Sequence, residues 1–343
     1  MKVLITGGCG FLGTNLSLYY IEKGHSVIAY DNLAKHEFTR NSYMKPEARV
    51  YNMEVLKKMG AQIAVKDIRD KKTLMKIARD CDYICHTAAQ PAMTISCEDP
   101  DLDFSTNVTG TFNVLEVAKQ IDIPVAICSS IHTYGPDKIN SELKEDKSRY
   151  VRDPVAIGET EPLLQGTVTP LHASKRCGEV YAQSYIDTFN MKVACFRLTG
   201  IYGSYQFGGE DHGWVANFSI RAHIGLPMTI FGTGKQLRDI LFAYDVCTAF
   251  DSFYTSGVAG IYTLGGGQDN MISLLECIEL IKKITGSEPE VNFDKDRFGD
   301  LRYFVADYTK FNKATGWKPQ VRPEEGVANL IEWVKDNDHL FQR

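Results

Sequence analysis

The first thirteen residues constrain the fold most strongly, because a short apolar strand runs directly into a turn made largely of glycine. Lys2–Thr6 has the composition of a buried strand, and Gly-Gly-Cys-Gly-Phe-Leu-Gly follows it. Glycines at this spacing allow a tight exit from a strand, a close approach of backbone N–H groups to a diphosphate, and close packing of the next helix. We expect that helix to open at Thr14. The dinucleotide-binding residues predicted in the turn are Gly7, Gly10, Phe11, Leu12 and Gly13.

An acidic residue ends the second predicted strand. Asp31 lies roughly twenty residues beyond the turn, where a carboxylate accepts hydrogen bonds from both ribose hydroxyls of an adenosine. Its charge disfavours the extra phosphate of NADP, so the predicted cofactor is NAD, although Lys35 nearby would favour NADP. We expect the neighbouring Asn32 to share this site. Asp67 and Ile68, after the third strand, are candidates for the adenine contact, with an ordinary turn role equally open for Asp67.

Short apolar runs alternate with amphipathic segments through the first half of the chain. Continuous apolar strands without polar alternation belong in a sheet that is covered on both faces, which predicts an α/β fold with a doubly wound parallel sheet of the Rossmann type. The predicted strands are Lys2–Thr6, Ser26–Tyr30, Gln62–Lys66, Tyr83–Thr87, Val125–Ser129 and Lys192–Leu198. The predicted helices are Asn15–Lys23, Lys72–Ala78, Asn107–Gln120 and Ala173–Phe189.

The character of the sequence changes near Gly200, where glycine and aromatic residues become more frequent. We therefore predict a smaller mixed C-terminal substrate domain. The cofactor domain would comprise residues 1–200 and about 239–265, and the second domain about 201–238 and 266–343. Asp239–Phe253 is expected to return to the first domain, and Ser273–Thr285 and Pro323–Lys335 to form amphipathic helices. Pro136–Gly166 is the one long polar insertion.

Composition excludes several function classes. The chain has 343 residues, of which 44% are hydrophobic and 24% charged, and its net charge of -5 without any Lys/Arg-rich run argues against nucleic acid as a partner. Its longest apolar runs fall far short of the ~20 residues that cross a bilayer, so no membrane association is expected. Its nine cysteines form no cluster with metal-ligand spacing. We expect a cytoplasmic protein without a metal centre.

Several motifs together resemble one enzyme family. His86-Thr87-Ala88-Ala89, Asn107-Val108-Thr109-Gly110-Thr111, Ser129-Ser130 before Tyr134-Gly135, and Ser174-Lys175 follow the glycine turn in order. This arrangement resembles the extended short-chain dehydrogenase/reductase family, and within it the sugar-nucleotide epimerases and dehydratases. The likeness is greatest to epimerases of CDP-linked sugars, through Phe207, Asp211–Val215, Gly234–Asp239 and Val305–Asp307.

The resemblance implies an NAD-dependent epimerase that transiently oxidises a sugar hydroxyl, acting on a CDP-sugar or another pyrimidine diphosphate sugar. The alternatives are a dehydrogenase or dehydratase with an atypical base, or a non-catalytic protein that binds NAD and a nucleotide sugar. A homodimer is also implied, formed through the helices at Asn107–Gln120 and Ala173–Phe189. The implied cofactor and catalytic residues include Ala88, Asn107, Ser130 and Lys175, and the implied substrate residues are Gln90, Trp214, Asn217, Arg238 and Arg302.

One position departs from the family pattern. A Tyr-x-x-x-Lys pair ending at Lys175 would place a tyrosine at 171, where this chain has Leu171, which carries no proton. His172 could substitute because it shares a helix face with Lys175, although it could equally serve packing. His132 is the favoured substitute: the resemblance implies an active-site acid two residues before Tyr134, and a histidine with a pKa near neutrality suits proton transfer, although a core histidine bonded to the backbone is an open alternative. The third alternative is that turnover has been lost.

Overall fold

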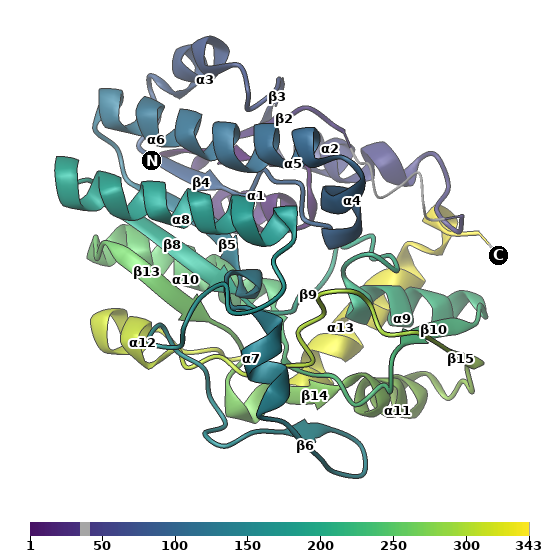
Figure 1. The fold of residues 1–343 in the computed structure, drawn as a ribbon. Coiled ribbons are helices and arrows are strands. Elements are labelled where there is room, and N and C mark those ends of the chain that lie inside the picture. Colours follow the sequence, from purple (N-terminus) through teal and green to yellow (C-terminus); the bar gives the residue numbers. More distant parts are fainter. Residues whose placement is uncertain (35–41, 343) are drawn as a thin grey trace.

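The computed structural model describes residues 1–34 and 42–342 (Figure 1). Within them, seven parallel strands form one sheet in the order β13-β8-β5-β4-β1-β2-β3. The chain enters at β1 and builds outward first in one direction and then in the other, so the crevice between β1 and β4 is the point at which ligands bind in such sheets. The strands are β1 Lys2–Thr6, β2 Ser26–Asp31, β3 Gln62–Val65, β4 Tyr83–His86, β5 Val125–Ser130, β8 Val193–Leu198 and β13 Gly260–Leu264.

Helices cover both faces of this sheet, which confirms the predicted α/β doubly wound fold. The helices form two groups, defined below, and the apolar side chains of each group pack on one face of the sheet. Figure 1 shows α6 and α8 lying side by side over the sheet. The first group is α3 Lys71–Ala78, α6 Gly110–Ile121 and α8 Pro170–Phe189, and the second is α1 Phe11–Glu22, α10 Ala243–Ser256 and α12 Thr309–Thr315.

Three predicted helix starts are wrong by several residues, and one of them is that of α8, which begins at Pro170 rather than at Ala173. Helix α1 begins at Phe11 rather than at Thr14, because Gly10 has an extended backbone and its carbonyl already accepts the N–H of Thr14 at 2.9 Å. Asn107 does not open a regular helix but lies within a wider π-helical turn, Phe104–Thr109. Its buried side chain bonds to three neighbouring segments, and this tertiary demand prevails over regular helical geometry.

The second half of the chain adds a smaller mixed body. Helices α9 Trp214–Ile224, α11 Leu274–Thr285 and α13 Pro323–Asp336 pack together around their own apolar core. Between them lie a three-stranded sheet, β14-β11-β16, and a two-stranded sheet, β10-β15. These strands are β14 Met271–Ser273, β11 Leu237–Asp239, β16 Tyr303–Phe304, β10 Met228–Phe231 and β15 Val291–Asp294. The chain then returns to the large sheet, where helix α10 packs against α1.

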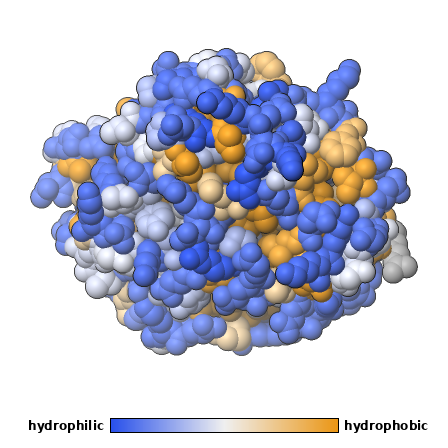
Figure 2. Space-filling model, turned by 90° about the horizontal axis from the view of Figure 1, so that it is seen from below, coloured by the Kyte–Doolittle hydropathy of each residue, from blue (hydrophilic) through white to orange (hydrophobic). Residues whose placement is uncertain are grey.

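The polar insertion at 136–166 begins with helix α7, Pro136–Ser141, and continues into a hairpin, and it contacts the smaller body. The Ile157 N–H donates to the Val305 carbonyl at 2.7 Å, and the Tyr150 N–H to the Lys235 carbonyl at 2.9 Å. Figure 2 views the molecule from below and shows a largely hydrophilic face on which apolar residues gather in a few patches. Across the described ranges, no helix has the length and apolarity needed to span a bilayer.

The remaining helices and strands lie outside the three sheets described so far. The helices are α2 Ala48–Lys58, α4 Met93–Glu98, α5 Pro100–Asp103 and α7 Pro136–Ser141, with single turns at Ile131–Thr133, Gln268–Asn270 and Asp338–Leu340. The strands are β6 Lys144–Glu145, β7 Tyr150–Val151, β9 Ile201–Tyr202 and β12 Leu241–Phe242.

Candidate active site

A cavity of about 260 Å³ lies at the carboxyl ends of β1, β2 and β4. One part of its wall comes from the glycine turn and the strand ends, and the other from the loops around Pro91 and Gln206. The cavity is therefore continuous from the sheet to the smaller body. The predicted residues in its wall are Gly7, Gly10, Phe11, Leu12, Gly13, Asp31, Asn32, Ile68, Ala88 and Gln90.

Backbone packing explains the glycines of the turn. Gly7 has φ +67°, and a Cβ there would lie 2.7 Å from the backbone N of Ala88. At Gly13 a Cβ would lie 2.0 Å from the Gly7 carbonyl oxygen, so the helix could not approach the turn this closely with any side chain. The N–H groups of Phe11, Leu12 and Gly13 begin α1 and have no carbonyl one turn earlier to bond. The turn thus fits the diphosphate of a dinucleotide.

The Asp31 carboxylate ends β2 beside this turn. It accepts the Cys9 N–H at 2.9 Å and the Leu33 N–H at 2.7 Å, so the backbone fixes its orientation at the cavity wall. A carboxylate held in this way fits a ribose with two hydroxyls and repels a phosphate on either of them. Lys35, the residue that would favour NADP, lies outside the described residues.

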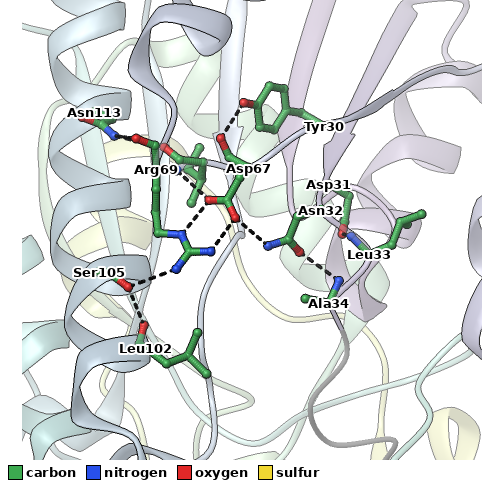
Figure 3. A network of polar contacts seen from close by, with 11 residues as sticks. Tyr30, Asp31, Asn32, Leu33, Ala34, Asp67, Arg69, Leu102, Ser105 and Asn113 are labelled. Carbon is green, nitrogen blue, oxygen red and sulfur yellow. Dashed lines mark hydrogen bonds and ion pairs between the residues drawn. The ribbon is translucent and has the colours of Figure 1, made fainter.

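A polar network borders the same end of the cavity (Figure 3). Arg69 pairs with the Asp67 carboxylate at 2.7 Å, and Asn32 donates its amide to the same carboxylate at 3.1 Å. The hydrogen bonds from Arg69 hold the pKa of Asp67 well below its usual range. Ile68 lies in the cavity wall, whereas Asp67 is engaged by Arg69 beside it. The sequence had not singled out Arg69, since a lone cation after a strand is common.

Asn107 joins three segments beneath the cavity. Its side-chain oxygen accepts the Gln90 N–H at 2.9 Å, and its amide lies 3.0 Å from the Asp103 carboxylate and 3.1 Å from the Ser174 hydroxyl. Gln90 is itself engaged, because its amide donates to Asp103 and to the Ala92 carbonyl. Asn107 therefore holds the loop after β4 against α8, which carries Lys175.

Lys175 and Ser130 lie at the carboxyl end of β5. The Lys175 ammonium donates to the Cys128 carbonyl at 3.2 Å, and burial lowers its pKa. Lys175 also lines a second, small polar cavity together with Asn107 and Ser129. The Ser130 hydroxyl accepts the His132 N–H at 3.2 Å, so it fixes the turn that carries His132.

Leu171, at the position of the absent tyrosine, is packed in the interior of the protein. Leu171 is 1% exposed, and its N–H donates to the Ser96 hydroxyl. The neighbouring His172 is fully buried, and its Nδ1 accepts the Thr169 N–H at 3.2 Å in the cap of α8. The rings of His172 and His132 are nearly perpendicular, with centroids 5.3 Å apart. The structure thus brings together the two predicted substitutes for the tyrosine.

The expectation of a near-neutral pKa for His132 needs correction. Burial, together with the smaller effects of the nearby His172, Arg238 and Lys175, lowers the pKa of His132 to about 3. All of these neighbours are cations or become cations on protonation, so a positive charge on His132 is opposed from each side. The histidine is neutral at neutral pH in this structure.

The predicted substrate cations differ in their surroundings. Arg238, on β11, is largely buried and lies 3.5 Å from the Asp300 carboxylate, whereas Arg302 pairs with Asp296 at 2.6 Å near the surface. Arg297 was missed by the sequence analysis. Its guanidinium lies 3.9 Å above the centre of the Phe231 ring and donates to the Glu210 carbonyl, and burial lowers its pKa. Nothing in the local sequence distinguishes it from a surface arginine.

The other two predicted substrate residues lie on α9 outside the cavity wall. The Asn217 side chain is buried and accepts hydrogen bonds from Tyr43 at 2.8 Å and Arg221 at 3.1 Å, while Trp214 packs edge-on against Phe218. Three unpredicted side chains do line the cavity, and each has a buried polar atom without a hydrogen bond among the described residues. These atoms are Oδ1 of Asn52, Oε1 of Gln206 and Nδ1 of His212.

Comparison with known proteins agrees with this geometry. The model of the NAD dependent epimerase/dehydratase family matches residues 3–265. CDP-paratose 2-epimerase from Salmonella typhi is 32% identical, with 97% of this chain and 99% of that protein covered. UDP-glucose 4-epimerase from Thermotoga maritima, solved with UDP-glucose, has a TM-score of 0.81 at 27% identity over 98% and 99% of the two chains. The Thermus thermophilus UDP-glucose 4-epimerase, solved with NAD, has a TM-score of 0.78 at 29% identity, again over 98% and 99%.

Proposed function

The chain belongs to the NAD-dependent epimerase/dehydratase family, and on that premise we propose that it inverts one carbon of a pyrimidine nucleotide sugar by transient oxidation of a hydroxyl. The observation that carries this proposal is the continuity of the cavity. Its wall includes the glycine turn and Asp31 as well as loops of the smaller body at Gln206 and His212. A cofactor and a second ligand would therefore share one cavity.

NAD fits the part of this wall that holds the glycine turn and Asp31. The N–H groups at the start of α1 would bind its diphosphate, Asp31 its adenosine ribose, and Lys175 the ribose next to the nicotinamide. When bound, NAD supplies a hydride acceptor that returns the hydride within the same turnover. The chain's own task is then to bind the sugar, to exclude water and to move one proton.

Leu171 cannot accept the proton of the sugar hydroxyl, so another residue must do so. We assign this role to His132, which lies beside Lys175 and Arg238 and whose backbone is fixed by the Ser130 hydroxyl. Ser130 would in turn hydrogen-bond the reacting hydroxyl. Arg238 would bind the diphosphate of the nucleotide sugar, with Arg297 as a second cation across Asp300. The contact of Arg238 with Asp300 is long, since 3.5 Å is at the limit of a hydrogen bond.

A preference for a CDP-sugar rests on similarity to CDP-paratose 2-epimerase from Salmonella typhi. A homodimer is the assembly we propose, because α8 presents apolar side chains to solvent. Val180 is 50% exposed, Tyr181 40% and Phe189 48%. A cytoplasmic location stays a prediction.

The test combines ligand binding with detection of the epimerised product. We expect NAD to raise the melting temperature of the purified protein, and a CDP-sugar to raise it further. Mass spectrometry should then detect a second epimer of the sugar after incubation, with UDP-sugars processed more slowly. Absence of any thermal shift with NAD would contradict the proposal at its first step.

The buried Leu171 favours one second candidate, a protein that binds NAD and a nucleotide sugar without turnover. This candidate predicts the same thermal shifts and no epimer. Mass spectrometry of the nucleotide sugar separates it from a dehydratase, because a dehydratase would form a product lighter by one water.

A further inference from the structure

The start of α8 defines the chemistry of His172. Helix α8 begins at Pro170, and Thr169 caps it, so His172 occupies the third helical position. Its Nδ1 accepts the Thr169 backbone N–H at 3.2 Å and lies 2.6 Å from the Thr169 hydroxyl. A glutamate or glutamine commonly fills this position and closes the cap with a side-chain acceptor. In this chain the imidazole Nδ1 is that acceptor.

A backbone N–H only donates, so Nδ1 of His172 must be the unprotonated nitrogen. The proton of the neutral ring is therefore on Nε2. Protonation of Nδ1 would set two hydrogens against each other, and both Thr169 and His172 are buried away from water. Burial also lowers the pKa of His172, which favours the neutral ring further. The cap thus leaves the ring with one conformation and one tautomer.

The Nε2–H group of this tautomer is buried and has no hydrogen bond among the described residues. A buried donor without an acceptor is costly, so a bound ligand that supplies an acceptor oxygen gains from it. The His132 ring packs nearly perpendicular to the His172 ring, and its Nδ1 is also buried without a partner in the described part of the chain. The two rings, with centroids 5.3 Å apart, thus hold one donor and one acceptor that no described residue uses.

We propose that the cap of α8 locks His172 as an Nε2–H donor to the reacting sugar oxygen, which leaves His132 to accept the proton. This inference rests on the proposed function. In the forward step the O–H bond would break and its proton would pass to His132, while the C–H bond would give up its hydride, which bound NAD would accept, and a C=O bond would form. The His172 N–H stabilises the carbonyl oxygen throughout and is not consumed. On reversal, His132 returns the proton.

The groups around the pair agree with this division of roles. His132 faces His172 and Lys175 from α8 and Arg238 from β11, and the charges of Lys175 and Arg238 oppose a positive charge on it at rest. His172 cannot act as a base through Nδ1, because the cap occupies that nitrogen, nor through Nε2, because that nitrogen already carries the proton. Of the two histidines that could replace the missing tyrosine, only His132 has a ring nitrogen left to accept a proton.

Nitrogen-15 NMR of histidine-labelled protein tests the lock before any turnover. In the unliganded protein we expect the His172 Nδ1 signal in the pyridine-type range and Nε2 in the pyrrole-type range, with no change between pH 5 and 8. His172→Gln identifies the signal. The opposite tautomer, or an imidazolium that titrates in this range, would overturn the proposal.

Ligand addition tests the donor role. Addition of CDP-glucose to the NAD-bound protein should shift the His172 Nε2 proton downfield, whereas CDP, which lacks the sugar, should not. His172→Gln keeps both a cap acceptor and a donor and should retain hydride transfer within about tenfold, whereas His172→Leu should lose at least about a hundredfold in kcat with little change in NAD affinity. A Leu variant as active as the Gln variant would overturn the role. If the wild type binds CDP-glucose and shifts the Nε2 proton but transfers no hydride, the proposed function fails while the donor assignment holds.

Discussion

His132 shows how one residue's charge depends on the ligand that the site receives. In the unliganded protein, burial and nearby cations keep its pKa at about 3. That value is low for a base at neutral pH, since proton transfer works best when the pKa lies near the working pH. A nucleotide diphosphate at Arg238 would cancel one of the positive charges and add negative charge. The bound substrate would then raise the pKa of His132 toward the working pH.

This leads to a prediction about the His132 pKa. Because a negative ligand favours the imidazolium, binding of CDP should raise the pKa of His132 by on the order of one unit or more. NMR titration of labelled protein with and without CDP measures it, with Arg238→Gln as the control in which the ligand-induced change shrinks. A pKa that stays at its unliganded value with CDP bound would contradict this view of the site.

Residues also mark the limit of prediction from the sequence. Gly7, Gly13 and Asp31 could be placed because backbone sterics and charge allow few alternatives at a strand end. Asn52 and Gln206 could not, because each reaches the cavity only through tertiary packing of a segment without a local signal. His132 and His172 were identified as a pair of alternatives, and only the cap contact at Thr169 separates their roles.

At the scale of elements, the alternation of apolar strands and amphipathic helices predicted the doubly wound sheet, since each strand buried on both faces leaves a continuous apolar run. Boundaries were less predictable. The start of α1 depends on the extended backbone of Gly10, and the π-helical turn around Asn107 depends on its contacts with Gln90 and Ser174 in other segments. Hydrophobic periodicity reports neither of these contacts.

The contact between β1 and α1 carries a second prediction. A Cβ at Gly13 would lie 2.0 Å from the Gly7 carbonyl oxygen, so Gly13→Ala must push the helix away from the turn. We expect it to lower the free energy of unfolding by about 1–3 kcal/mol and to abolish the thermal shift with NAD.

Gly178→Ala provides the matched control within α8. The added methyl group would lie 3.5 Å from the Thr111 side chain, an ordinary contact, so helix propensity should make this variant as stable as the wild type or more stable, by up to about 1 kcal/mol. Urea unfolding of both variants measures the difference. Equal stability and equal NAD binding in the two variants would show that the tight approach at Gly13 has no energetic role.

At the scale of the whole molecule, the cavity forms where the large sheet meets the smaller body, so neither half holds the complete site. The assembly of two chains is a separate matter. Val180→Asp places a charge on the exposed apolar side of α8 and should convert a dimer into monomers, whereas Val50→Asp on α2, at a comparable 40% exposure, should not. Light scattering after size-exclusion chromatography distinguishes these outcomes. A wild type that elutes as a monomer would refute the dimer.

The most direct test of the central claim is rapid mixing of the NAD-bound protein with a CDP-sugar while the near-ultraviolet absorbance of reduced nicotinamide is followed. We predict that the band rises and falls within a turnover in the wild type and is nearly absent in His132→Gln, with both proteins binding the nucleotide sugar. A wild type that binds the sugar without any band, or a His132→Gln variant that forms the band at the wild-type rate, would contradict the account.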